Sequence, residues 1–161
     1  MKNYLLIILL LGLGFLSSCE DEEPVEETNP ITFTFDKDGT KSDYSGNCSW
    51  FDDPDYGTPY YISGWQSDDH NFKITLPKLE VNKWTQAVDS THVKLKLVLY
   101  GFTYTSSNGE ESDYTVEITK YDKESGRLEG TFSGKLSYFN VYSWTYNYTN
   151  ITNGTFVVDE D

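Results

Sequence analysis

Alternation of apolar and polar residues with a period of two is the feature that most limits what this chain can fold into. It recurs in segments punctuated by glycine, asparagine and aspartate: 31–35, 59–65, 72–76, 93–104, 114–121, 128–138, 142–148 and 151–158. Such alternation is typical of strands that bury one face. Aromatic residues make up 16% of the chain, which favours strands over helices. The sequence predicts an all-β domain, a single antiparallel β-sandwich or a barrel-like fold.

The alternation also predicts how the strands pair. Leu97 and Leu99 share one face, and a turn at Asn108-Gly109 would place Leu99 opposite Ile118, so that two apolar faces coincide. In the next hairpin the apolar residues of both strands occupy even positions. We therefore expect its loop to hold an odd number of residues, three or five, with Gly126 at positive φ.

A first aromatic run is expected to face outward. Tyr100, Phe102 and Tyr104 occupy the face opposite the leucines of the same segment, and Tyr121 shares that face. As exposed rings they would form a platform for a ligand, because an aromatic ring can lie against the apolar C–H face of a sugar. The alternative is burial under a second sheet, or a bulge at Gly101 that turns the rings inward.

A second aromatic run is expected to face the core. Tyr142, Trp144, Tyr146 and Tyr148 alternate with serine, threonine and asparagine, and this asymmetry favours one buried face. Truncating a buried aromatic residue to alanine costs about 3 to 5 kcal/mol, whereas a surface substitution usually changes stability by about 0.5 kcal/mol or less. The first run, Tyr100, Phe102 and Tyr104, should therefore tolerate truncation to alanine far better than a core residue such as Phe132.

The first residues are typical of an exported lipoprotein. An apolar run over 5–16 follows the basic Lys2 and is shorter than the roughly 20 residues of a membrane-spanning helix. The junction 16–19, Leu-Ser-Ser-Cys, resembles the lipobox of bacterial lipoproteins. The resemblance implies that residues 1–18 are a cleaved signal peptide and that Cys19 carries diacylglycerol and further acyl chains such as palmitate. At about 0.8 kcal/mol per buried methylene, these chains hold the protein on a membrane.

Residues 19–30 are expected to be an acidic tether. Six of the eleven residues after Cys19 are acidic and two are proline, a composition that cannot bury a core. The run resembles the surface-export signal of Bacteroidota lipoproteins, which implies an outer-membrane protein that faces the cell exterior; the alternative is a simple polar spacer. Residues 31–161 then form the β domain.

Charge and cysteine content narrow the function classes. The chain has a formal net charge of −14, which repels nucleic acid. Lipidation of Cys19 leaves Cys48 as the one remaining cysteine, so an internal disulfide is excluded and stability must come from packing.

The C-terminal third resembles a known group. Its motifs are Val-Glu-Ile-Thr-Lys-Tyr-Asp at 116–122, Gly-Thr-Phe-Ser-Gly at 130–134 and Ile-Thr-Asn-Gly-Thr-Phe at 151–156. They resemble the C-terminal pattern of small, β-rich surface lipoproteins of Bacteroidota, a family of unknown function. The resemblance covers roughly the last 50 residues, implies a β-sandwich or barrel-like domain and brings no catalytic residues.

No motif indicates an enzyme or a cofactor. The chain lacks a Gly-x-Ser-x-Gly elbow and a His-Glu-x-x-His pair. Cys48 with His70 or His92 could be compared to a thiol protease, but a catalytic cysteine needs a helix start and no helix is predicted, so we expect a buried thiol.

The sequence contains one candidate calcium site and one candidate glycosylation site. Asp52, Asp53 and Asp55 are candidate calcium ligands in a turn, with a solvated loop as the alternative. Asp38-Gly39, also acidic, is explained by a hairpin turn. Ser90, within Asp-Ser-Thr, resembles the O-glycosylation motif of exported Bacteroidota proteins.

These observations favour a noncatalytic, surface-exposed lipoprotein that binds a glycan or a protein partner. The alternative is a structural or accessory subunit of an outer-membrane assembly with no ligand of its own. A hydrolase ranks third, because abundant carboxylates without a defined spacing do not identify an acid and a nucleophile.

Replacing Cys19 by alanine should abolish lipid labelling and release the protein from the membrane fraction, because the anchor consists of acyl chains. Metabolic labelling with palmitate and fractionation of cells measure both effects. Retention of the unlabelled variant in the membrane would contradict the anchor.

Overall fold

The computed structural model describes residues 30–45, 48–52, 59–89, 93–106 and 111–161, and it confirms the all-β expectation. Within these ranges the chain forms one four-residue helix, α2 (Gln86–Asp89), and no helix long and apolar enough to span a membrane. The strands are β1 (Thr32–Lys37), β2 (Thr40–Asp43), β3 (Cys48–Asp52), β4 (Tyr60–Ser67), β5 (His70–Leu76), β6 (Asn82–Thr85), β7 (Lys94–Leu99), β8 (Phe102–Thr105), β9 (Asp113–Asp122), β10 (Arg127–Asn140) and β11 (Thr145–Glu160).

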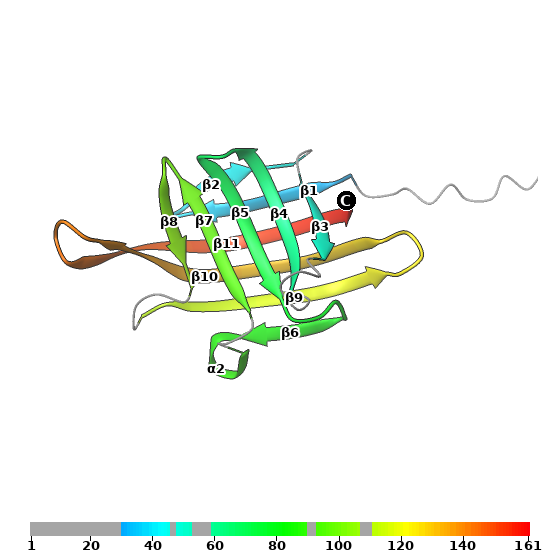
Figure 1. The fold of residues 1–161 in the computed structure, drawn as a ribbon. Helices are drawn as coiled ribbons and strands as arrows, with labels where there is room; N and C mark the ends of the chain where they lie inside the picture. Colours follow the sequence, from blue (N-terminus) through cyan, green and yellow to red (C-terminus); the bar gives the residue numbers. More distant parts are fainter. Residues whose placement is uncertain (1–29, 46–47, 53–58, 90–92, 107–110) are drawn as a thin grey trace, which may run out of the picture.

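The strands form two layers of one hydrogen-bonded sheet. The order β2-β1-β11-β10-β9-β6 makes one layer and β3-β4-β5-β7-β8 the other, and Figure 1 shows the second layer running diagonally across the first. The layers are joined where β11 pairs with β3 and where β10 pairs with β8. The result is barrel-like, as expected, but the β11–β3 pairing is parallel, so the sheet is mixed rather than purely antiparallel.

Aromatic rings fill the space between the layers. Phe33 and Phe35 of β1, Phe72 of β5 and Phe132 of β10 are all buried. The ring centroids of Phe72 and Phe132 lie 4.9 Å apart, and those of Phe35 and Phe72 lie 5.0 Å apart. Because these residues come from both layers, their contacts hold the layers together.

A two-residue turn at 100–101 reverses the expected face of the first aromatic run. Leu99 pairs with Phe102, not with Ile118 as the predicted hairpin required. Both turn residues have positive φ, 50° and 79°, as in the two-residue hairpin turns that match strand twist. Directly paired residues share a face, so Phe102 and Tyr104 lie on the inner face with Leu99. The prediction that they occupy the face opposite the leucines was wrong, whereas the expected exposure holds for Phe102, which is 48% exposed.

The β9–β10 hairpin reaches the expected pairing by another route. Its loop, 123–126, has four residues rather than three or five, while Gly126 has the predicted positive φ of 71°. A bulge at Thr119 adds the missing residue within β9 and restores the parity. The same bulge places Tyr121 opposite buried Leu128, so Tyr121 also lies on the inner face rather than the outer one.

A second bulge reverses the other aromatic run. β11 has one more residue than β10 at the bulge, where Asn153 has a φ of 52°. Along the chain, Ile151 lies in the core before the bulge and Phe156 after it, so the inward positions change from odd to even. Tyr146 and Tyr148 consequently lie on the outer face, and the prediction that this run faces the core was wrong.

The paired ends of β10 and β11 extend past the rest of the fold. Ser137 makes the contact of β10 with β8, and beyond it residues 138–140 pair with 145–147 alone. Figure 1 shows this hairpin projecting beyond β8. We call residues 138–148 the arm.

The β1–β2 turn fastens the root of the arm. Asp38 and Gly39 have φ of 48° and 82° and form the predicted hairpin turn. The Asp38 carboxylate accepts hydrogen bonds of 2.8 Å from Thr149 Oγ1 and from the Asn150 amide. Burial opposes ionisation of Asp38, but these bonds and nearby Lys37 outweigh it and lower its pKa.

Tyr104→Ala should destabilise the domain more than Phe102→Ala and less than Phe132→Ala. Tyr104 packs partly against the core and Phe102 is about half exposed, whereas Phe132 is buried. We expect about 3 to 5 kcal/mol for Phe132→Ala and about 1 kcal/mol or less for Phe102→Ala. Urea unfolding measures the loss of stability in each variant. Equal losses for Phe102→Ala and Tyr104→Ala would contradict the difference in burial between the two residues.

Asp38→Asn should reduce the decrease in the free energy of unfolding that occurs as the pH falls into the acid range. Since the folded-state pKa lies below the usual value of 3.8, the carboxylate stabilises the fold above pH 3.8 and loses this effect as the pH falls through the lower, folded value. Denaturant unfolding at about pH 7 and about pH 3 measures the change. Asp68→Asn, in the exposed β4–β5 turn, is the control, and an equal effect there would refute the assignment.

Candidate functional site

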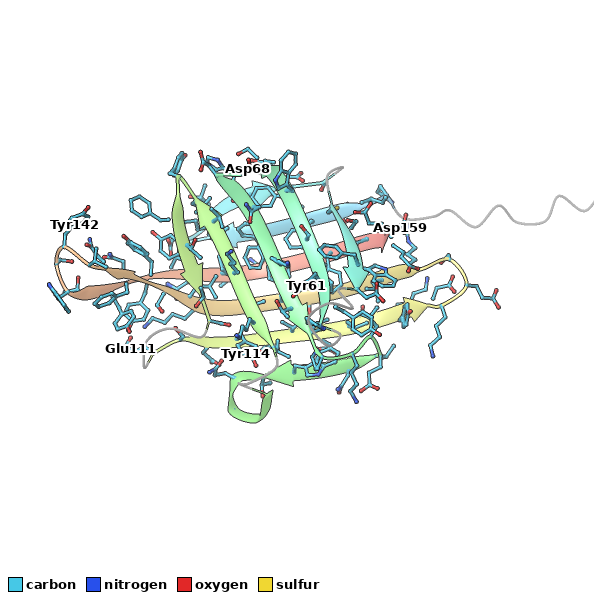
Figure 2. All side chains as sticks on the ribbon, in the orientation of Figure 1. Tyr61, Asp68, Glu111, Tyr114, Tyr142 and Asp159 are labelled. Atoms are coloured by element: carbon cyan, nitrogen blue, oxygen red, sulfur yellow. The ribbon has the colours of Figure 1, made fainter. Side chains whose placement is uncertain are left out.

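The arm carries the two most exposed aromatic side chains of the described structure, Tyr142 at 93% and Trp144 at 80%. Tyr146 of the arm is 43% exposed. Figure 2 shows Tyr142 at the far tip of the arm. Large apolar surfaces of this kind are costly in water and mark interaction sites.

Local hydrogen bonds hold the tip in one conformation. Asn140 Oδ1 accepts bonds from the amides of Tyr142 and Ser143, at 2.9 and 3.3 Å. The hydroxyls of Ser143 and Thr145 lie 2.7 Å apart. Trp144 has a φ of 56°, a left-handed conformation that costs a bulky residue on the order of 1 to 3 kcal/mol. Such a cost at an exposed tip is consistent with a functional role for the presented rings.

Four rings form a continuous strip on the outer face of the arm. We call Phe139, Trp144, Tyr146 and Tyr148 the outer strip. Phe139 and Tyr146 are paired across the strands with ring centroids 5.1 Å apart. The Phe139–Trp144 and Tyr146–Tyr148 centroids lie 6.2 and 6.3 Å apart. Contact along the strip fixes the rings in a row suited to an extended ligand.

The four predicted platform residues do not form one surface. Phe102 and Tyr104 meet on the inner face of the arm, where their ring centroids lie 5.0 and 5.8 Å from that of Tyr138. Tyr100 is exposed at the β7–β8 turn, and Tyr121 lies at the other end of β11. Their role in ligand binding stays a prediction.

Tyr121 belongs to the packing at the far end of the domain. Its ring stands perpendicular to that of Trp50, 6.2 Å away. Burial, then Glu160 and Tyr60, raise the pKa of Tyr121. This environment favours a structural role.

Tyr100 borders a cavity of about 460 Å³ between the two layers. Its ring stands edge-on to His70, with centroids 4.5 Å apart. Buried Tyr44 and half-buried Leu99 lie deeper in the cavity, and burial raises the pKa of Tyr44, with a smaller effect from Tyr100. Lysine and aspartate side chains of the β1–β2 hairpin line the opposite wall, so the cavity has mixed charge.

The outer strip ends in a second depression. The Lys135 ammonium lies 4.6 Å from the centre of the Tyr148 ring and forms an ion pair with Glu111. Beyond it a hollow of about 420 Å³ opens on the outer face of β9, β10 and β11. We call it the polar hollow; the polar side chains that line it include Asp113, Thr115, Ser133, Lys135, Asn150 and Thr152.

An uncharged segment builds the arm. From residue 136 to residue 158 the chain contains no Asp, Glu, Lys or Arg, although 24% of the whole chain is charged. Aromatic rings, hydroxyls and amides are therefore the groups that the arm offers to a ligand. The sequence prediction missed Phe139 as a site residue and assigned Trp144, Tyr146 and Tyr148 to the core, and this gap in the charge pattern could have identified them.

Several predicted sites lie outside the described residues: Cys19, Asp53, Asp55 and Ser90. Asp52 is exposed at the end of β3, and Cys48 is half-buried against the core. Among the described residues no three His, Cys, Asp or Glu side chains are grouped to hold a metal ion. The calcium and glycosylation predictions are thus not tested.

Comparison of the chain with protein-family models, curated proteins and solved structures finds no match.

Proposed function

We propose that this protein is a noncatalytic, lipid-anchored binding module of the outer-membrane surface that recognises a glycan through the outer strip. The observation that carries the proposal is the exposure of Trp144 and Tyr146 of the strip, 80% and 43%, beside a tip that Asn140 holds in place. Exposed rings on an ordered hairpin are ready to bind without further ordering of the chain.

The chemistry of the arm favours a glycan over a charged ligand. Tyrosine and tryptophan rings cover the apolar face of a pyranose, and neighbouring hydroxyls and amides can bond to its hydroxyl groups. The arm has both kinds of group and no formal charge. A charged ligand would gain no ion pair along the outer strip.

The position of the arm suits recognition away from the membrane. Thr32, at the start of β1, pairs with Val157 near the C-terminal end of β11. The arm contains the opposite end of β11, which begins at Thr145. Val157 and Thr145 are separated by about 40 Å of extended strand, and Figure 2 shows Tyr142 and Asp159 at opposite ends of the molecule. A lipid on Cys19 would therefore reach the domain from the end opposite the arm.

The same exposed rings support a second candidate. Tyr and Trp are enriched at the centres of protein interfaces, so an accessory subunit of an outer-membrane assembly could use the arm to hold a partner. A glycan array and crosslinking of the arm in cells separate the two candidates.

Trp144→Ala and Tyr146→Ala should each weaken glycan binding about two- to tenfold, since one ring against an apolar face contributes about 0.5 to 1.5 kcal/mol. Trp65→Ala is the matched control, because Trp65 is 46% exposed on β4 in the other layer. The Cys19→Ala protein would be screened on a glycan array and titrated by calorimetry, with unfolding curves to confirm unchanged stability.

Equal effects of Trp65→Ala and Tyr146→Ala would contradict the assignment of the strip. A protein that retains no glycan on the array, but whose arm crosslinks to an outer-membrane protein in cells, would replace the glycan proposal with the accessory subunit.

A further inference from the structure

We infer that the polar hollow is a subsite of the same binding surface, so that the outer strip and the hollow together bind the interior of a linear chain of uncharged or amino sugars. The inference rests on the proposed function and deepens it. It names the class of sugar and the way in which the chain is bound.

Strand pairing places the strip and the hollow on one face. Asp113 of β9 pairs with Lys135 of β10, which pairs with Asn150 of β11. Two residues further along β10, Ser137 pairs with Tyr148 of the strip. Paired residues and residues two apart along a strand share a face, so the rings lead directly into the polar row.

Lys135 forms the junction between the two parts. Its ammonium contacts the Tyr148 ring on one side and lines the hollow on the other. The ion pair with Glu111 compensates its charge. A sugar chain that follows the strip therefore passes over Lys135 without meeting an uncompensated cation.

The hollow adds aliphatic hydroxyls and amides to the indole N–H and phenol groups of the strip. Thr115 and Ser133 form one pair across β9 and β10, and Asn150 and Thr152 continue the row on β11. Hydroxyls and amides can both donate and accept, which matches the hydroxyl groups of a sugar ring. The rings supply contact area, and the hollow supplies selectivity.

Charge in the hollow excludes acidic sugars. Glu111 and Asp113 outnumber Lys135, so the hollow carries one excess negative charge. The Asp113 carboxylate accepts a bond of 2.7 Å from the Tyr114 amide and stays at the surface. Uronic or sulfated sugars would meet repulsion there, and an amino group would be attracted.

The shape fits the interior of a chain rather than its end. β9, β10 and β11 form the floor of the hollow, and the second layer lies on their other face. From Trp144 to Thr152 the site extends along β11 for about 26 Å, which is longer than one sugar ring. A chain can therefore run along the arm and across the hollow.

Three sets of β-1,4-linked oligosaccharides test the inference, each from disaccharide to hexasaccharide: glucose, glucosamine and glucuronic acid. We expect affinity to rise with length for the first two sets and to be about tenfold weaker for glucuronate at equal length. Asp113→Asn should lower the affinity for the glucosamine hexasaccharide about fivefold and leave that of the glucose disaccharide unchanged.

Asparagine keeps the acceptor oxygen for the Tyr114 amide, so Asp113→Asn should fold normally, and Asp68→Asn is the matched control. Tyr146→Ala should weaken both probes. An affinity that stops rising at the disaccharide, or no effect of Asp113→Asn, would overturn this inference and leave the proposed function standing on Tyr146→Ala. Failure of all three sets to bind would also overturn this inference, and retention of no glycan on the array would overturn both.

Discussion

Antiparallel pairing of β10 with β11 is the interaction on which the rest of the structure depends. These are the two longest strands, and they pair along nearly their whole length. On the edge away from β10, β11 pairs with β1 and β3. On the edge away from β11, β10 pairs with β9 and β8. Both layers, the junctions between them and the arm therefore start from one hairpin.

Close packing against this hairpin explains the glycines in it. A Cβ atom on Gly154 would lie 2.4 Å from the Phe132 carbonyl oxygen, and one on Gly130 would lie 2.3 Å from that of Glu117. Both distances are shorter than van der Waals contact, so a larger residue would force the strands apart. The aromatic core around Phe132 can thus approach the backbone of β11 directly.

Charge is distributed to leave the arm neutral in an acidic protein. Acidic residues near the arm serve structural bonds: Asp38 holds Thr149 and Asn150, and Asp36 accepts a 2.8 Å bond from Asn153 Nδ2. The bulge at Asn153 then directs the aromatic side chains outward beyond this fastening. Stability and ligand presentation are consequently supplied by neighbouring but different residues.

The sequence by itself determined the all-β class, most strand positions, the turn at Asp38-Gly39 and the positive φ of Gly126, because period-two alternation and turn chemistry are local. It did not reveal the short strands β3 and β6, which pair with the distant strands β11 and β9. Only the tertiary structure decided which aromatic rings face solvent. A single extra residue, at Thr119 or Asn153, or a two-residue turn at 100–101, exchanges the inner and outer faces of everything beyond it.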